Sequence, residues 1–308
     1  MRIRARSRTM AAIIAIVTTG LVLPAVPASA AAPLPKRAVA EGTGGAVVSD
    51  TAESTDAGLA VLREGGTAAD AAVAVAATLG VTDPYVAGIG GGGYLVYYDA
   101  RTHQVTTIDG RETAPASDTA NLFIDPATGK PLAFPTAVTS GLSVGVPGTL
   151  MTWQQVLSRF GRFGLAHDLV PAERVADNGF VVNATINEQT RENAFRFDQF
   201  GSTAALFLPG GQLPAVGSVL RNPDLADTYR QIGRQGVRAL YGGSIGADVV
   251  NTVHNLPLVP GATLVPRPGT MRLADLAAYR APFQAPTHVN YRGYDVYGMA
   301  PSSSGGTT

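Results

Sequence analysis

Two short runs of strand-forming residues are the clearest pattern in the chain. Residues 94–98 and 105–109 are rich in tyrosine, valine, threonine and isoleucine, and a polar stretch separates them. β-Branched and aromatic side chains favour strands, and a short polar connection between two such runs favours a hairpin. The pattern therefore predicts an antiparallel hairpin with its loop at residues 99–104.

The residues before this hairpin carry the signals of a buried helix. Thr67 and Asp70 have the spacing of a capping box, and small apolar residues fill positions 71–77. A helix that is apolar on every side is expected to be buried, and its alanines let it approach a sheet closely. An earlier helix is expected to follow a short strand at residues 46–48.

Helical periodicity dominates after the hairpin. Between residues 150 and 160 apolar side chains recur every three or four positions, and Gly161 ends the pattern. Asn222-Pro223 is a good helix start, because proline suits the first helical position. Further helices are predicted at residues 168–178, 183–197, 244–254 and 273–279, and a short strand at residues 295–297. Strands near both ends with helices between them favour a layered domain of α and β structure over a helix bundle.

The composition narrows the class of protein. The chain has 308 residues, of which 45% are hydrophobic and 15% charged, which fits a globular protein of one large domain or two small ones. It contains no cysteine, which excludes disulfides, thiol nucleophiles and cysteine-bound metals. The histidines show no metal-ligand spacing, so no metal site is expected; they are His103, His167, His254 and His288.

The first thirty residues have the organisation of a signal peptide. Alternating arginines at positions 2–8 precede a short apolar run at residues 11–23, and Ala28-Ser29-Ala30 fits a cleavage site. The apolar run is too short for a membrane span. We therefore expect the protein to be exported, to a secreted or periplasmic location, as a mature chain that starts near Ala31 and has no membrane span.

Removal of this segment changes the net charge. The full chain carries 23 basic and 23 acidic residues, and cleavage would remove four arginines and no acid, which leaves a net charge of −4. Nucleic-acid binding usually requires a basic face. We therefore expect no nucleic-acid partner.

Two familiar motifs occur in contexts that argue against their usual chemistry. Gly88, Gly90 and Gly93 match the dinucleotide-binding spacing, but a helix is predicted before them and a strand after them, the reverse of the required order. Residues 141–145 match the nucleophile elbow of serine hydrolases, but Pro147 interrupts the helix that must follow the serine. We expect both segments to be loops.

Arg111 is the candidate binding residue. It follows Gly110 at the end of the second predicted strand and precedes Glu112. An arginine held at a strand end presents a planar fork of N–H donors, which suits a carboxylate. The alternative from the residues alone is a surface ion pair between Arg111 and Glu112.

Several segments, taken together and in order, resemble the gamma-glutamyltransferases, also called gamma-glutamyltranspeptidases. The resemblance is closest in residues 65–74, in the glycine run at residues 90–93 and in Arg111-Glu112-Thr113-Ala114-Pro115. It continues at residues 147–149, 240–245, 275–279, 291–294 and 300–306, so it spans nearly all of the mature chain. Each segment is short, and the combination is specific to the family.

The resemblance implies an α+β fold, the αββα sandwich of N-terminal-nucleophile hydrolases. Such proteins are made as one precursor that cuts itself into a large and a small subunit. The new N-terminal threonine of the small subunit attacks the γ-glutamyl carbonyl, with its own amine as general base. The γ-glutamyl group passes from glutathione or another donor to water, an amino acid or a peptide, and no cofactor is implied. Arg111 matches the family arginine that binds the α-carboxylate of the donor.

The end of the chain departs from the family pattern. Residues 300–306 resemble a segment inside the family's large subunit, and the chain stops soon after, at Thr307-Thr308. Cleavage before Thr307 would release only a dipeptide, so no catalytic residue is assigned within the chain and the nucleophilic threonine is expected downstream of Thr308. The chain is then a signal peptide at residues 1–30 and a partial large subunit at residues 31–308, an incomplete sandwich. Without the small subunit we expect exposed strand edges and apolar faces, low solubility and no activity.

Three other interpretations stay open from the sequence. The chain also fits a non-catalytic protein that binds γ-glutamyl compounds through Arg111. It fits one half of a split enzyme whose other half is a separate chain. The related cephalosporin and glutaryl acylases share much of the architecture that the resemblance implies, so an acylase with a different donor is the third interpretation.

Overall fold

The computed structural model describes residues 39–307, and the predicted signal peptide at residues 1–30 lies outside them. The helices are α1 (Ala52–Arg63), α2 (Ala68–Thr82), α3 (Pro84–Ala87), α4 (Phe134–Thr139), α5 (Thr149–Phe160), α6 (Leu165–Asp168), α7 (Val170–Asn178), α8 (Ala184–Phe197), α9 (Gly201–Phe207), α10 (Pro223–Gln235), α11 (Arg238–Tyr241), α12 (Ser244–His254) and α13 (Leu273–Ala278), with 3₁₀ turns η1 (Gly141–Ser143), η2 (Pro209–Gly211) and η3 (Ser304–Gly306). The strands are β1 (Gly93–Asp99), β2 (Gln104–Gly110), β3 (Phe180–Val181), β4 (Val219–Leu220), β5 (Phe283–Gln284), β6 (Thr287–Tyr291) and β7 (Tyr294–Gly298).

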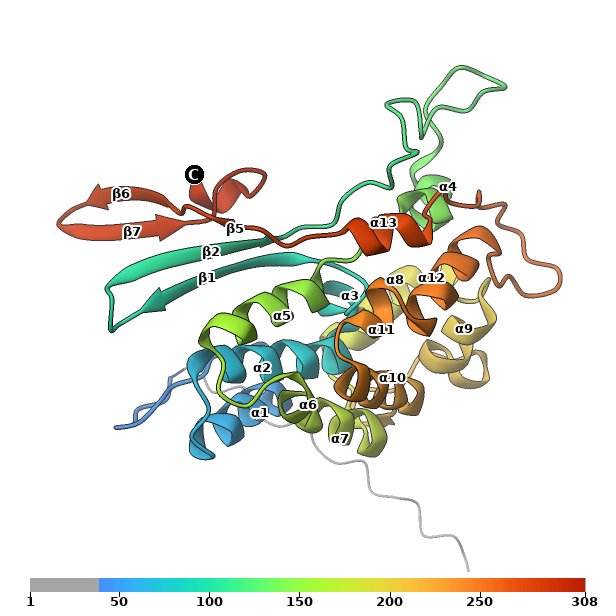
Figure 1. Ribbon diagram of the computed structural model, residues 1–308. Helices are drawn as coiled ribbons and strands as arrows, with labels where there is room; N and C mark the ends of the chain where they lie inside the picture. Colours follow the sequence, from blue (N-terminus) through green and yellow to red (C-terminus); the bar gives the residue numbers. More distant parts are fainter. Residues whose placement is uncertain (1–38, 308) are drawn as a thin grey trace, which may run out of the picture. The chain divides into compact units, whose positions relative to one another are not determined.

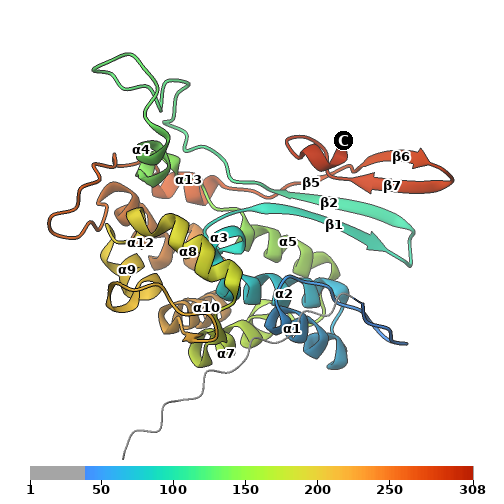
Figure 2. The same cartoon turned by 180° about the vertical axis from the view of Figure 1, so that it is seen from behind.

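Within the described residues, helices pack on one side of a small antiparallel sheet. β1, β2 and β5 form that sheet, and α5 lies directly against β1 and β2 (Figure 1). Figure 2 shows the same elements from behind, with α1, α2, α7 and α10 on the side of the sheet where α5 lies. β6 and β7 form a separate hairpin that follows β5. The α+β class expected from the sequence is confirmed.

The sheet has a covered inner face and a more open outer face. β1 and β2 are the predicted hairpin, paired antiparallel over residues 93–99 and 104–110. Alternate side chains of a strand point to opposite faces. Ile108 of β2 faces the helices and is fully buried, whereas Val96 of β1 faces outward and is 48% exposed. On the inner face Tyr97 stacks on Phe160 of α5, with ring centroids 4.0 Å apart.

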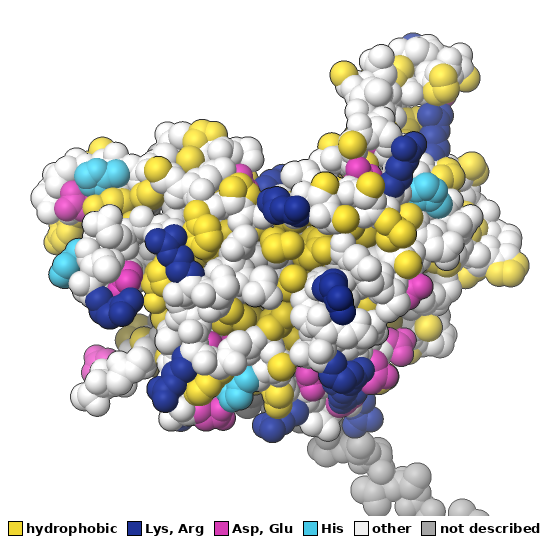
Figure 3. All heavy atoms as spheres, in the orientation of Figure 1, with side chains coloured by type: hydrophobic (Ala, Val, Ile, Leu, Met, Phe, Trp, Pro, Cys, Tyr) yellow, Lys and Arg dark blue, Asp and Glu magenta, His cyan; other side chains and the backbone are white. Residues whose placement is uncertain are grey.

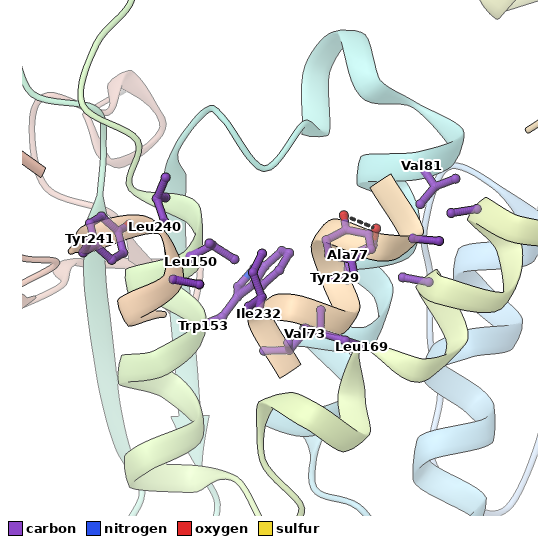
Figure 4. Packing of buried hydrophobic residues seen from close by; sticks show 14 of the residues in the cluster. Val73, Ala77, Val81, Leu150, Trp153, Leu169, Tyr229, Ile232, Leu240 and Tyr241 are labelled. Atoms are coloured by element: carbon purple, nitrogen blue, oxygen red, sulfur yellow. Dashed lines mark hydrogen bonds between the residues drawn. The ribbon is translucent and has the colours of Figure 1, made fainter. Parts of the chain in front are cut away.

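The helices on the inner face share an apolar core that is centred on α2 (Figure 4). Val73 and Ala77 of α2 are buried, and α2 packs against α5, α6 and α7, as the small apolar residues of this segment predicted. Tyr229 of α10 is also fully buried, and its hydroxyl donates to the carbonyl of Ala77 at 2.9 Å. This bond gives the buried hydroxyl the partner that it needs away from water.

The start of α2 is the predicted capping box. The Asp70 carboxylate accepts the N–H and the hydroxyl of Thr67, each at 2.7 Å. It also accepts the N–H groups of Arg162 and Phe163, just after α5, at 2.9–3.0 Å. Burial opposes ionisation of Asp70, but these hydrogen bonds outweigh it and lower the pKa to about 2. One carboxylate therefore joins the beginning of α2 to the end of α5.

Three local expectations differ from the structure. Residues 46–48 are not a strand, because no described strand lies beside them to pair with. The helix expected at residues 168–178 is present as α7 but begins two residues later, at Val170, after the short helix α6 has ended at Asp168. α4 and η1 lie between the β1–β2 hairpin and α5, where no helix was predicted.

Apolar side chains also reach the surface over the strands. Figure 3 shows them over the strands as well as between the helices, with basic side chains scattered around them on this face. In the β6–β7 hairpin Val289 is 57% exposed and Tyr294 is 75% exposed. No helix within residues 39–307 is both long enough and apolar enough to cross a membrane.

Candidate substrate-binding site around Arg111

Arg111 stands directly after β2, at the end of the β1–β2 sheet. Its backbone is held on both sides. Its N–H donates to Oδ1 of Asp109 at 3.0 Å, and its carbonyl accepts the hydroxyl of Tyr279 at 2.8 Å. Asp109 is in turn held by the side-chain amide of Gln284 in β5, at 3.1 Å. The strand end therefore fixes the Cα of Arg111, while its side chain extends into solvent.

The guanidinium of Arg111 is accessible. Its side chain is 63% exposed, and among the described residues it forms one ion pair, from Nε to Oε2 of Glu112 at 3.4 Å. The ion pair named as the alternative from the sequence is thus present. The ion pair involves only the Nε atom of the guanidinium, at the rather long distance of 3.4 Å. An exposed ion pair with a single contact of this kind is weak. The Nη groups are left to donate to a carboxylate in the bidentate geometry that arginine favours.

Arg111 lines a hollow of about 530 Å³, a size typical of small-molecule sites. Its walls come from Gly90 in the loop before β1, from residues 111–114 after β2 and from residues 143–145 around the end of η1. Glycine is required where these walls approach one another. A Cβ atom at Gly92 would lie 2.3 Å from the carbonyl oxygen of Gly110, which is closer than any real contact.

Main-chain hydrogen bonds tie the walls of this hollow together. The N–H groups of Gly148 and Thr149 donate to the carbonyl of Gly91, at 2.9 and 3.2 Å. The N–H of Val146 donates to the carbonyl of Thr113 at 2.8 Å. The loop before β1, the segment after β2 and the start of α5 are therefore held in place before any ligand binds.

Two stacked tyrosines lie beneath the segments that form the hollow. Tyr279 and Tyr241 are buried, with ring centroids 5.7 Å apart and planes 9° apart. The Tyr241 hydroxyl donates to the carbonyl of Pro147 at 2.8 Å and accepts the N–H of Met151 at 3.1 Å. Burial raises the pKa of both hydroxyls, that of Tyr279 to about 12, with nearby negative charge adding to the effect. Both hydroxyls therefore stay protonated at neutral pH and act as donors.

Neither of the two familiar motifs has the setting that its usual chemistry requires, although residues 141–143 form the 3₁₀ turn η1 rather than a loop. The glycine run lies between α3 and β1, so a helix precedes it and a strand follows, which is the wrong order for a dinucleotide site. Ser143 lines the hollow, but its hydroxyl lies 2.9 Å from the carbonyl of Ser140, and the next helix begins only at Thr149. Ser143 therefore lacks the strand–turn–helix setting of a nucleophile elbow.

Other candidate sites in the described residues are weaker. No three histidine, aspartate or glutamate side chains of residues 39–307 come together as metal ligands. A second hollow of about 610 Å³ lies between α8 and α9 and shares no lining residue with that at Arg111. Its walls are mainly apolar, with Asp198 as the charged residue. The Arg111 hollow is the one that brings a cation and loop backbone together.

Sequence reasoning named Arg111, which lines the hollow, and assigned no role to Tyr279. The segment at residues 275–279 was noted for its resemblance, but no role was attached to the tyrosine. Its bond to Arg111 spans 168 positions of the chain. The one available signal was a tyrosine directly after a short predicted helix, which does not say what its hydroxyl contacts.

Comparison with known proteins agrees with these observations. The family profile described as Gamma-glutamyltranspeptidase matches residues 54–308. The "Glutathione hydrolase proenzyme" of Bacillus subtilis (strain 168) is 34% identical over 300 residues, which cover 95% of this chain and 49% of that protein. The "Acylase ACY 1 proenzyme" of Pseudomonas sp. (strain V22) is 34% identical over 271 residues, with 87% and 46% covered. The chain spans about half the length of the curated relatives it matches.

Solved structures give the same result for the fold. The gamma-glutamyltranspeptidase of Helicobacter pylori superposes with a TM-score of 0.80 at 30% identity, over 87% of this chain and 73% of that chain. The transpeptidase CapD of Bacillus anthracis superposes with a TM-score of 0.68 at 27% identity, over 86% and 79%. The α+β fold of the described residues is therefore the fold of these N-terminal-nucleophile hydrolases, over the 73% and 79% of their chains that superpose.

Proposed function

The chain belongs to the gamma-glutamyltranspeptidase family, and we propose that it supplies the donor-binding part of an enzyme that transfers γ-glutamyl groups. The donor is glutathione or another γ-glutamyl compound, and the acceptor is water, an amino acid or a peptide. The observation that carries this proposal is Arg111, an accessible arginine at a fixed strand end beside a preformed hollow. Membership of the family suggests the reaction, and Arg111 is the residue through which this chain would take part in it.

Arg111 binds the α-carboxylate of the donor in this proposal. Its exposed Nη groups match the two oxygens of a carboxylate, and charged hydrogen bonds of this type contribute about 1.5–3 kcal/mol. The carboxylate is then anchored at one end of the donor, which leaves the γ-carbonyl to extend away from the guanidinium. The role of this chain is therefore to bind and orient the donor.

In this proposal the chemical step is carried out by the small subunit. A threonine at the N-terminus of a small subunit attacks the γ-carbonyl, its amine takes the proton of the hydroxyl, and a γ-glutamyl-threonine ester forms. The C–N bond of the donor breaks, its leaving amine (that of cysteinylglycine when glutathione is the donor) takes the proton, and the acceptor then resolves the ester. The small subunit is the partner that this proposal requires, and residues 31–308 are a portion of the large subunit. Export directed by residues 1–30 is part of the same proposal.

An acylase is the second candidate function. The acylase of Pseudomonas sp. is as similar in identity as the B. subtilis glutathione hydrolase. A glutaryl group has the same length as a γ-glutamyl group and carries the same terminal carboxylate, but it lacks the α-ammonium. Arg111 would serve either donor, so the substrate itself must decide between them.

The test compares Arg111→Lys with Arg101→Lys in the complete protein that contains this chain. Arg101 is an exposed arginine in the turn at the other end of the same hairpin, so it controls for the loss of a surface guanidinium. We expect Arg111→Lys to raise KM for γ-glutamyl-p-nitroanilide by about tenfold or more, because lysine keeps the charge but loses the fork. Arg101→Lys is expected to leave KM unchanged.

Two outcomes would contradict the proposal. An unchanged KM in Arg111→Lys would remove this arginine from the donor site. Faster turnover of glutaryl-p-nitroanilide than of the γ-glutamyl compound, with KM still dependent on Arg111, would replace γ-glutamyl transfer by the acylase function.

A further inference from the structure

The main chain of Arg111 depends on a residue far away in the sequence. Its carbonyl accepts a hydrogen bond at 2.8 Å from the hydroxyl of Tyr279, just after α13. Its N–H is held from the other side by Asp109. These two bonds act on opposite ends of the same residue, so together they determine where the Arg111 side chain begins and in which direction it leaves the backbone.

Tyr279 is itself held rigidly. Its residue is 4% exposed, and its ring stacks on Tyr241 in nearly parallel planes. Tyr241 is tied through its hydroxyl to Pro147 and Met151, at the start of α5. The neighbouring backbone leaves no spare room, because a Cβ atom at Gly148 would lie 2.3 Å from the Tyr279 hydroxyl. The direction of the Tyr279 O–H group is therefore fixed by its surroundings.

We propose that Tyr279 is a positioning residue for donor binding, which acts through the carbonyl of Arg111. The inference rests on the proposed function, since it concerns the same site. Tyr279 is not among the residues that line the hollow. It holds the Arg111 backbone at the distance from the glycine loop at which the guanidinium meets a carboxylate.

The arrangement of charges supports a donor role for the hydroxyl. Burial, together with the negative charges of Asp109 and Glu112, raises the pKa of Tyr279 to about 12. The hydroxyl consequently keeps its proton over the whole range in which an enzyme of this family would be assayed. Loss of the hydroxyl would leave the carbonyl of Arg111 without this partner, and the segment after β2 would pivot about the Asp109 bond.

The experiment compares Tyr279→Phe with Tyr229→Phe in the complete protein. Each substitution removes one buried hydroxyl that donates to a backbone carbonyl, at 2.8 Å from Tyr279 and at 2.9 Å from Tyr229. Tyr229 contacts Ala77 in the helical core, away from Arg111. We expect Tyr279→Phe to raise KM for γ-glutamyl-p-nitroanilide about three- to tenfold with little change in kcat. Both variants are expected to lower the melting temperature by similar amounts, but Tyr229→Phe is expected to leave KM unchanged.

A double-variant cycle separates positioning from a general structural effect. If Tyr279 acts through Arg111, its effect on KM should largely vanish in the Arg111→Lys background, because the fork that it positions is already gone. Equal KM values for Tyr279→Phe and Tyr229→Phe, or fully additive effects with Arg111→Lys, would overturn the inference and leave the proposed function intact. If Arg111→Lys itself had no effect on KM, both the proposed function and this inference would fall.

Discussion

The two faces of the β1–β2–β5 sheet differ in what covers them. On the inner face, α5 and the helices behind it enclose Ile108, and Tyr97 stacks on an aromatic ring of α5. On the outer face, Val96 is 48% exposed and Tyr98 is 55% exposed. Both faces carry strand-forming residues, but within the described residues the helices cover the inner face, and on the outer face Thr107 is buried while Val96 and Tyr98 are not.

This difference distinguishes a packed part of residues 39–307 from a part that stays exposed. The inner layer has an apolar core, and the buried polar side chains of Asp70 and Tyr229 within it have hydrogen-bond partners. The outer face and the adjacent β6–β7 hairpin keep apolar side chains in contact with water. Extended apolar surfaces of this kind are typical of protein interfaces. The exposed apolar faces expected from the sequence are thus present on the outer side of the sheet.

The largest effect should come from substitution on the inner face. Ile108→Ala removes a fully buried side chain, and we expect it to lower the free energy of unfolding by about 2–5 kcal/mol. Val96→Ala lies on the neighbouring strand of the same sheet but faces outward, and we expect a change of about 0.5 kcal/mol or less. Chemical denaturation of both variants measures the difference. Equal losses would mean that the outer face is covered as well as the inner one.

Two histidine–aspartate pairs extend the comparison to charged groups. His167 contacts Asp168 at 3.2 Å in the covered helical layer, where Asp168 is fully buried. His288 contacts Asp295 at 2.8 Å on the exposed β6–β7 hairpin. Burial raises the pKa of Asp168 to about 7, although the bond from His167 opposes this and the charge of Asp70 adds to it. The hydrogen bond from His288 lowers the pKa of Asp295.

The second prediction follows from the opposite directions of these two shifts. Between about pH 4 and pH 7 the folded protein keeps a proton on Asp168 that the unfolded chain loses, so the free energy of unfolding falls as the pH rises through this window. Asp168→Asn should remove this slope and stabilise the protein at pH 7, on the order of 2 kcal/mol. Asp295→Asn should leave the slope unchanged, because a lowered pKa acts below this window.

Denaturation at several pH values between 4 and 8 tests this prediction. The groups that face Asp168 are His167 from its own turn and Asp70 from α2, while Glu64 binds the other side of His167 at 2.9 Å. An unaltered slope in Asp168→Asn would show that Asp168 is ionised in the folded protein at pH 5–6. Its location in the core would then need a different compensating charge.

The inner layer was predictable from sequence where its signals are local. The capping box of Thr67 and Asp70 and the start at Asn222-Pro223 depend on neighbours three or four positions away, and both helices begin as expected. The strand expected at residues 46–48 failed because a strand is defined by a partner, which local residues do not reveal. α7 begins two residues after its predicted start, next to Pro171, a helix-start signal that the prediction did not use.

The same distinction between local and long-range signals applies to the residues of the site. Arg111 could be found because a family motif and a strand end coincide there. Tyr279 could not be assigned, since its contact with Arg111 depends on the path of the chain over 168 positions. The nucleophile, the signal peptide at residues 1–30 and the subunit boundary stay predictions, because they concern segments outside the described residues.

The smallest effect on stability is expected for substitutions in the exposed β6–β7 hairpin. Val289 and Val296 are paired directly across the β6–β7 hairpin and are 57% and 48% exposed. Changing both to threonine keeps the β-branched shape and removes apolar surface, so the free energy of unfolding should change by about 0.5 kcal/mol or less.

The same double variant should alter association of the 308-residue chain far more than its stability. We expect weaker concentration-dependent association in sedimentation velocity and weaker binding of an apolar dye, because a contiguous apolar surface is interrupted. Val48→Thr, at a 95% exposed valine outside the strands, is the matched control and should change neither quantity. If the double variant also changed neither, the hairpin would not be an association surface. The two sides would then differ in solvent exposure but not in their tendency to associate.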